Sequence, residues 1–249
     1  MPAARNRDNR TLRFHMNDSS QFLATPRVVA TVHRPQDLQA LASRPADDTI
    51  CDLLEFRLDN LREHLDEVET VVRSTQVPCL MTARHSDEGG AGFLDEATRE
   101  SLLRRFLPMA QLIDIEIRSL PAMADLVNDA RNAGVGVIAS CHDFQKTLPL
   151  SDLESAIVAT QAGFADVVKI AMTLNSMSDM TILLLLTEAT VASGQKISSM
   201  GMGRLGKVSR LALAAAGSCL NYGFLHEPNA PGQWPAAELK RLIGELLPQ

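Results

Sequence analysis

The stretch ADVVKIAMT, Ala165 to Thr173, is an almost unbroken run of apolar residues rich in valine and isoleucine. A strand with one face in water alternates polar and apolar residues. A continuous apolar run of this length is instead typical of a strand that is covered on both faces, as in a parallel sheet. Segments with helical composition precede the run at 151–162 and follow it at 178–193. The sequence therefore predicts a parallel strand connected by helices.

The same strand and helix pattern repeats along the chain. Strands are predicted at 27–33, 51–57, 78–84, 112–117, 134–141, 165–172, 196–202 and 218–224. Helices are predicted at 36–43, 60–75, 95–107, 120–132, 151–162, 178–193, 207–216 and 236–247. Eight such units in 249 residues predict an α/β fold, an eight-stranded parallel β/α (TIM) barrel. A doubly wound open sheet is the alternative, but the Gly-rich turn expected after its early strand is absent.

No linker-like run divides the chain, so we expect one catalytic barrel domain over 27–249. Residues 1–26 are predicted to be a polar tail, or a β-hairpin that closes the barrel bottom, with a short strand at 11–16. The apolar run 182–186 is far shorter than the roughly 20 residues that cross a bilayer. It predicts a buried helix and no membrane association.

Charge and cysteine content narrow the class of protein. The formal net charge is −6, and the basic residues are scattered, which argues against a nucleic-acid partner. Cys51, Cys79, Cys141 and Cys219 lie far apart in or beside apolar runs. They are expected to be reduced core residues of a cytoplasmic protein.

Lys169 lies in the middle of the apolar strand quoted above. Burying an ammonium group is costly, so such a lysine is usually paired, extended to an edge, or neutral. A neutral lysine is a nucleophile. The structural alternative is a salt bridge to Asp114 or Glu116 across the barrel.

Polar residues recur where the predicted strands end, which is where a β/α barrel builds its active site. Each has an ordinary structural explanation: a core histidine at His142, an ion pair of Arg57 with Glu55, a solvated turn at Glu88, core methionines. Their convergence on one end is harder to explain by packing. These residues are Glu55, Arg57, Arg84, Glu88, Asp114, Glu116, His142, Asp143, Lys169, Arg210 and Gln233.

Taken together, these residue types predict Schiff-base chemistry. A lysine in an apolar wall near arginines has a lowered pKa and can form an imine with a ketone or aldehyde. A histidine on the neighbouring strand is suited to remove the proton that the imine acidifies. Arginines beside a cationic imine indicate an anionic substrate, most simply a carboxylate. The residues therefore predict a Schiff-base lyase that acts on a small oxo-acid.

With these residues identified, the sequence resembles type I 3-dehydroquinate dehydratase. The resemblance rests on motifs that run in family order over most of the chain. They are DLLEFRLD (52–59), TARHSDEGG (82–90), IDIEI (113–117), SCHDF (140–144), VKIAMT (168–173), SMGMGRLGKVSRL (199–211) and APGQW (230–234).

The resemblance implies a homodimeric barrel without cofactor or metal that dehydrates 3-dehydroquinate to 3-dehydroshikimate. The reaction would be the same in aromatic amino acid biosynthesis through the shikimate pathway and in quinate breakdown. Lys169 matches the Schiff-base lysine, His142 the acid/base, and Glu88 the carboxylate that orients it. The matching substrate-binding positions are Glu55, Arg57, Arg84, Arg210 and Gln233, with Met200, Met202 and Tyr222 lining the pocket.

The last motif departs from the family, because Asn229 stands where the family usually has serine before APGQ. We expect Asn229 to contact the substrate as that serine would. One alternative function is another class I aldolase-like enzyme. A second is a catalytically retired barrel that binds dehydroquinate or quinate as a regulator.

Overall fold

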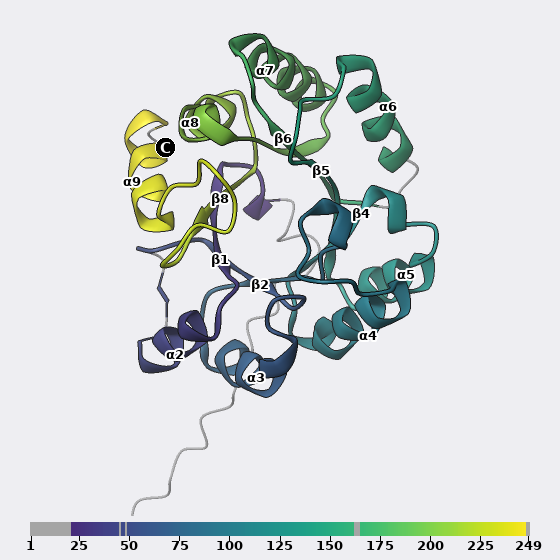
Figure 1. Ribbon diagram of the computed structural model, residues 1–249, viewed down its shortest axis with the longest axis vertical. Coiled ribbons are helices and arrows are strands. Elements are labelled where there is room, and N and C mark those ends of the chain that lie inside the picture. The colour runs from purple at the N-terminus through teal and green to yellow at the C-terminus, as the bar shows by residue number, and fades with distance from the viewer. Residues whose placement is uncertain (1–20, 45, 48, 162–164, 248–249) are drawn as a thin grey trace, which may run out of the picture.

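The computed structural model describes residues 21–44, 46–47, 49–161 and 165–247, which form a parallel β/α barrel (Figure 1). The predicted strand at 11–16 lies outside these ranges, and so does the part of the predicted capping hairpin that falls within residues 1–20. All eight strands predicted from 27 onward are present. They are β1 (Arg27–Val32), β2 (Leu53–Arg57), β3 (Cys79–Thr82), β4 (Leu112–Glu116), β5 (Gly136–Asp143), β6 (Val167–Thr173), β7 (Lys196–Met202) and β8 (Leu220–Phe224).

The helices follow one another around the outside of the strands (Figure 1). Each predicted helix is confirmed to within a few residues. They are α2 (Pro35–Ser43), α3 (Leu65–Ser74), α4 (Glu96–Phe106), α5 (Ala124–Asn132), α6 (Leu150–Gln161), α7 (Met177–Ala192), α8 (Gly206–Ala215) and α9 (Ala236–Leu246). Short 3₁₀ turns include η2 (Ser86–Glu88) and η5 (Gly203–Leu205).

The sheet is nearly closed. Parallel pairing runs in the order β7-β6-β5-β4-β3-β2-β1-β8. Among the described residues no ladder joins β7 to β8. The Cys219 amide donates to Ile197 O at 2.8 Å, and Ser198 Oγ donates to Leu220 O at 2.7 Å. We call this junction the β7–β8 seam; it is closed by a main-chain bond and by the hydroxyls of Ser198 and Ser218.

The core has an inner and an outer layer. Inside the barrel, alternate strand residues such as Leu53, Leu80 and Ile138 pack against one another. The opposite faces of the strands pack beneath the helices, with Phe56 and Ile115 among the buried residues. Burial on both faces explains why the strands are apolar without alternation.

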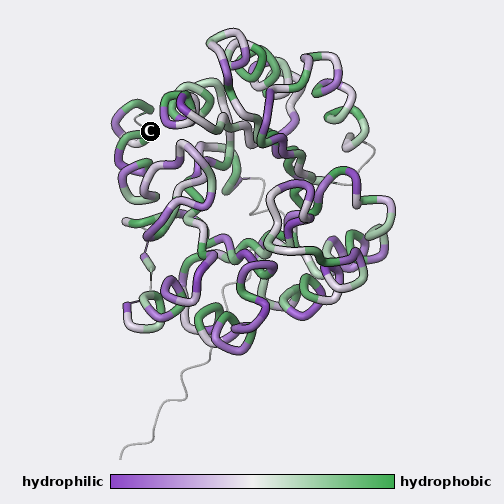
Figure 2. The backbone as a smooth tube through the Cα atoms, in the orientation of Figure 1, coloured by the Kyte–Doolittle hydropathy of each residue, from purple (hydrophilic) through white to green (hydrophobic). Residues whose placement is uncertain are grey.

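Helix α7 corrects one expectation, because it is buried on one face only. Leu183 and Leu186 are buried, whereas Leu185 is 52% exposed. At 3.6 residues per turn, five consecutive apolar positions cannot all face the barrel. The middle of α7 is accordingly hydrophobic all round (Figure 2). Within the described ranges, no helix combines the length and apolarity needed to span a membrane.

Candidate active site

A cavity opens toward the C-terminal ends of the strands. Every residue predicted to act in catalysis or substrate binding lines it, whereas Asp114, Glu116 and Asp143 of the strand-end set do not. Its lining also includes four residues that the sequence reasoning missed: Thr31, Phe144, Ala171 and Ala230. The remaining lining residues are Glu55, Arg57, Arg84, Glu88, His142, Lys169, Met200, Met202, Arg210, Tyr222, Asn229 and Gln233.

Lys169 projects from β6 into this cavity and is 3% exposed. Its Nζ donates to Asp114 Oδ2 at 2.9 Å and lies 3.8 Å from Glu55 Oε1. The face of the Tyr222 ring lies 4.0 Å from Nζ, a cation–π distance. Burial lowers the pKa of Lys169, while Asp114 and Glu55 oppose that shift. The salt bridge considered from the sequence is therefore present, with Asp114 as the partner, and the amine is still easier to deprotonate than a free lysine.

His142 forms a pair with Glu88 at the end of β5. Its Nδ1 lies 3.0 Å from Glu88 Oε2, and its main-chain N–H donates to the same oxygen at 2.9 Å. Burial, together with Arg84 and Lys169, lowers the pKa of His142 well below its ordinary value, so the ring is neutral at pH 7. A carboxylate can only accept, so the pair places the imidazole proton on Nδ1 and the lone pair on Nε2.

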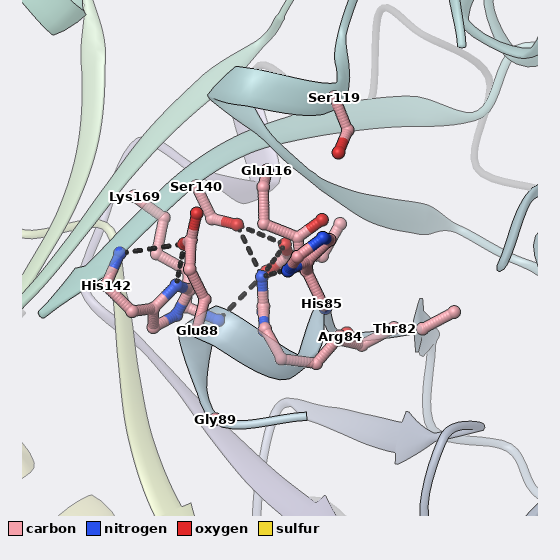
Figure 3. A network of polar contacts seen from close by, with 12 residues as sticks. Thr82, Arg84, His85, Glu88, Gly89, Glu116, Ser119, Ser140, His142 and Lys169 are labelled. Carbon is pink, nitrogen blue, oxygen red and sulfur yellow. Dashed lines mark hydrogen bonds and ion pairs between the residues drawn. The ribbon is translucent and has the colours of Figure 1, made fainter. Parts of the chain in front are cut away.

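Arg84 forms the centre of a buried polar network (Figure 3). Its Nη1 donates to Asp114 at 2.8 Å, to Glu116 at 2.9 Å and to Ser140 at 2.6 Å. Burial opposes ionisation of Asp114, but Arg84 and Lys169 hold the pKa of that carboxyl well below its ordinary value. The carboxylate next to Lys169 is therefore ionised throughout the physiological range.

Behind this network, Arg99 of α4 is fully buried and bonds Glu116 on the side opposite Arg84. Its Nε also donates to Ala83 O at 2.8 Å. Glu116 is thus held between two guanidinium groups, one on each carboxylate oxygen, while Arg84 Nη1 also bonds Asp114.

The ion pair of Arg57 with Glu55, which was the structural alternative to a role in the site, is not formed. Arg57 instead makes two hydrogen bonds to Asp59, at 3.0 and 2.8 Å, and donates to Gly89 O at 2.9 Å. Glu55 is held by hydroxyl groups, because Thr31 and Thr82 each donate to it at 2.9 Å. This arrangement leaves Glu55 beside Lys169.

Arg210, from α8, is a buried guanidinium that has no carboxylate partner within the described chain. It is 1% exposed, and its Nη1 donates to Gly201 O, Gly206 O and Gly232 O at 2.7–2.9 Å. Its Nε donates to Tyr222 O at 2.9 Å. Burial lowers the pKa of Arg210 to about 10. A buried cation with only neutral partners favours an anionic ligand.

The loop between β8 and α9, residues 225–235, forms one wall of the cavity. Gln233 Oε1 accepts from the main-chain N–H groups of Asn229 at 2.9 Å and Ala230 at 3.3 Å. Asn229 Oδ1 and the Tyr222 hydroxyl are buried without a hydrogen-bond partner. Buried polar atoms are normally bonded, so both are suited to contact a bound molecule.

The missed residues carried weak signals. Thr31 lies near the C-terminal end of the first predicted strand, and β/α barrels build their active sites at the C-terminal ends of their strands. Phe144 is within the SCHDF motif, and its ring covers Gly89, where a Cβ atom would lie 2.5 Å from Phe144 Cζ. Among the described residues, no group of three or more His, Cys, Asp or Glu side chains is arranged to hold a metal ion.

Comparisons with known proteins agree with this geometry. The family model for type I 3-dehydroquinase matches residues 28–246. The catabolic 3-dehydroquinate dehydratase of Acinetobacter baylyi is 33% identical over 223 residues, covering 84% of this chain and 82% of that protein. The 3-dehydroquinate dehydratase of Enterococcus faecalis is 31% identical over 231 residues, covering 88% and 91%.

A solved structure is similar over the whole barrel. The type I 3-dehydroquinate dehydratase from Clostridium difficile with covalently modified comenic acid superposes with a TM-score of 0.80 at 28% identity, covering 90% of this chain and 92% of that one. The match of the family model over nearly the whole chain, with the cavity described above, shows that this chain belongs to the type I 3-dehydroquinase family.

Proposed function

We propose that this protein removes water from 3-dehydroquinate to give 3-dehydroshikimate through an imine on Lys169. The observation that carries the proposal is a buried lysine of lowered pKa in the same cavity as a neutral, carboxylate-bonded histidine. Membership of the family decides against the other class I aldolase-like enzymes, and the complete set of Lys169, His142 and Glu88 favours an enzyme over a retired barrel.

In the first half of the reaction, neutral Lys169 adds to the C3 ketone, and the carbonyl oxygen leaves as water with one proton from the amine and one from solvent. The resulting iminium is a cation in a buried site. Asp114 and Glu55 lie beside Nζ and stabilise that charge, as does the face of Tyr222. The same carboxylates therefore favour the intermediate more than the neutral amine that precedes it.

In the second half, Nε2 of His142 accepts the proton from C2, and the electron pair moves into the iminium. The electrons then return and expel the C1 hydroxyl, which takes the proton from the imidazolium and leaves as water. Glu88 supports this exchange because it bonds Nδ1 and stabilises the imidazolium between the two transfers. Hydrolysis of the imine releases the product and regenerates Lys169.

The substrate carboxylate is assigned to the end of the cavity that holds Arg210 and Gln233. Support comes from the buried guanidinium, whose partners within the described chain are carbonyl groups. The ring hydroxyls are assigned to Glu55, Arg57 and Arg84. Further contacts are assigned to Asn229, Tyr222, Met200 and Met202.

Borohydride trapping tests the assignment of the imine. Sodium borohydride added with 3-dehydroquinate should inactivate the protein and add the mass of the reduced adduct to the peptide that contains Lys169. The Lys169→Met variant should form no adduct, whereas the matched Lys146→Met variant should react like the wild type. An adduct on Lys146, or none in the wild type, would contradict the proposal.

We further propose that the protein works in the cytoplasm as a homodimer. The support for the dimer is the outward side of α7 and its neighbours. Met177, Leu185 and Val191 on α7 are 60%, 52% and 41% exposed, and Val158 on α6 is 62% exposed. Exposed apolar side chains on neighbouring helices are typical of an interface between subunits.

A further inference from the structure

The loop that carries Asn229 and Gln233 is fastened to the neighbouring segment after β1 by four polar side chains, since β1 and β8 pair in the sheet. His226 and Glu227 lie near the start of this loop, and Arg34 and Asp37 lie at the beginning of α2. His226 Nδ1 is 2.9 Å from Asp37 Oδ1, and Arg34 Nη1 is 2.5 Å from Glu227 Oε2. We call these four residues the clasp.

Asp37 is the buried centre of the clasp. Its side chain is 1% exposed, whereas that of His226 is 46% exposed. Asp37 Oδ2 accepts the main-chain N–H groups of His33 at 3.2 Å and Arg34 at 3.1 Å. Burial opposes ionisation, but hydrogen bonds from His226, His33 and Arg34 hold the pKa of Asp37 below its ordinary value. The clasp therefore presents a fixed, ionised acceptor to the loop.

The second half of the loop is anchored independently. Arg210 Nη1 donates to Gly232 O at 2.7 Å, and the Gly203 amide donates to Pro231 O at 3.2 Å. Asn229 lies between these bonds and the clasp. The clasp is thus the attachment of the N-terminal half of the loop to the barrel body.

We propose that the clasp is a positioning device for catalysis, in which His226, held by Asp37, keeps the loop over the cavity so that Asn229 and Gln233 meet the substrate. The ion pair of Arg34 with Glu227 forms a second, more exposed link between the loop and the start of α2. The inference rests on the proposed reaction, because the loop residues act there as substrate contacts. His226 itself does not line the cavity, so its effect passes through the loop.

Three variants test the clasp. His226→Ala removes the donor to Asp37, and His226→Asn restores a donor close to the position of Nδ1. His64→Ala is the matched control, because His64 is also partly exposed and its Nδ1 lies 3.4 Å from a carboxylate, that of Glu67. KM and kcat should be measured for each, together with amide hydrogen exchange over 225–233.

In His226→Ala, we expect KM to rise roughly tenfold, as for a lost hydrogen bond to a charged group, with kcat within about threefold of the wild type. Exchange at the Asn229 and Ala230 amides should accelerate at least about tenfold, while strand amides stay protected. His226→Asn should return both quantities toward wild type, and His64→Ala should change neither.

Unchanged loop exchange in His226→Ala would overturn the clasp. So would faster exchange spread over the strands, or a defect in His226→Asn equal to that of alanine. The exchange measurement needs no turnover. If the wild type did not convert 3-dehydroquinate, the proposed reaction would fail while the exchange data still decided the clasp.

Discussion

The pair of His142 and Glu88 combines two pKa effects that together suit a general base. Burial with Arg84 and Lys169 lowers the pKa of the imidazole, and burial raises the pKa of Glu88. The hydrogen bond of 3.0 Å nevertheless keeps the proton on Nδ1. A base whose pKa lies below its ordinary value stays unprotonated in mildly acidic solution.

This pair leads to a prediction for pH dependence. Because protonated His142 is inactive as a base, the rate of elimination from the preformed imine, measured in a single turnover, should hold below pH ~6.5 and decline only at lower pH. Glu88→Gln removes a negative charge from beside the ring, which lowers the imidazole pKa further. The acidic limb should therefore move to lower pH, and kcat should fall roughly 10- to 100-fold. A pH–rate profile with an unchanged acidic limb would contradict the assigned role of Glu88.

Residue types at strand ends predicted which side chains line the cavity, but not which of them form hydrogen bonds or ion pairs with one another. The position of Lys169 in an apolar strand indicates its burial, since period and composition are local properties. Its pairing with Asp114 depends on which of two carboxylates, two residues apart on β4, lies nearer across the barrel. Arg57 shows the same limit, because Asp59 follows the strand and its orientation is set by the turn.

At the level of elements, the N-terminus of α8 and the loop after β8 meet through two glycines. A Cβ atom on Gly206 would lie 2.8 Å from Gly232 Cα and 2.9 Å from Gly232 O. Gly232 has a φ of +79°, which favours glycine on its own account. This close approach lets one nitrogen of Arg210 reach carbonyls in both segments.

Gly206→Ala should therefore push the loop away from α8. We expect KM to rise more than tenfold and the free energy of unfolding to fall by roughly 1–3 kcal/mol, as for an overpacked contact. Gly244→Ala in α9 is the control, because nothing lies within 4 Å of the added Cβ atom. That variant should gain roughly 0.5–1 kcal/mol with KM unchanged. Urea unfolding measures the free energy of unfolding, and steady-state kinetics measure KM. Equal changes of these two quantities in Gly206→Ala and Gly244→Ala would be evidence against the packing argument.

Every strand and helix from residue 27 onward was predictable, because burial on both faces makes a parallel strand apolar without interruption. The exposed side of α7 was not predictable. An apolar run such as 182–186 has the same sequence pattern whether the barrel or another subunit covers it. The β7–β8 seam was also not predictable, because contact between these two strands, which stand at the two ends of the sheet order, depends on closure of the whole sheet.

For the whole molecule, the outward side of α7 predicts the oligomeric state. Leu185→Lys should convert a dimer into a monomer, because it places a charge within the apolar group. Activity should persist, since Leu185 does not line the cavity. Leu246→Lys is the control, as Leu246 is 57% exposed on α9. Light scattering after size exclusion gives the mass; a wild-type monomer, or a dimer unaffected by Leu185→Lys, would refute the interface.

The β7–β8 seam has a consequence for how this enzyme can evolve. Lys169 and His142 stand on strands joined by a continuous ladder, with His142 opposite Ala171 in register. Arg210 instead spans the seam, because it bonds Gly201 O on β7 and Tyr222 O on β8. Mutations that widen the seam would move Arg210 and so change which carboxylic acid substrate fits the cavity. The distance between Lys169 and His142 would stay the same. Substrate range and reaction type are therefore separately evolvable in this barrel.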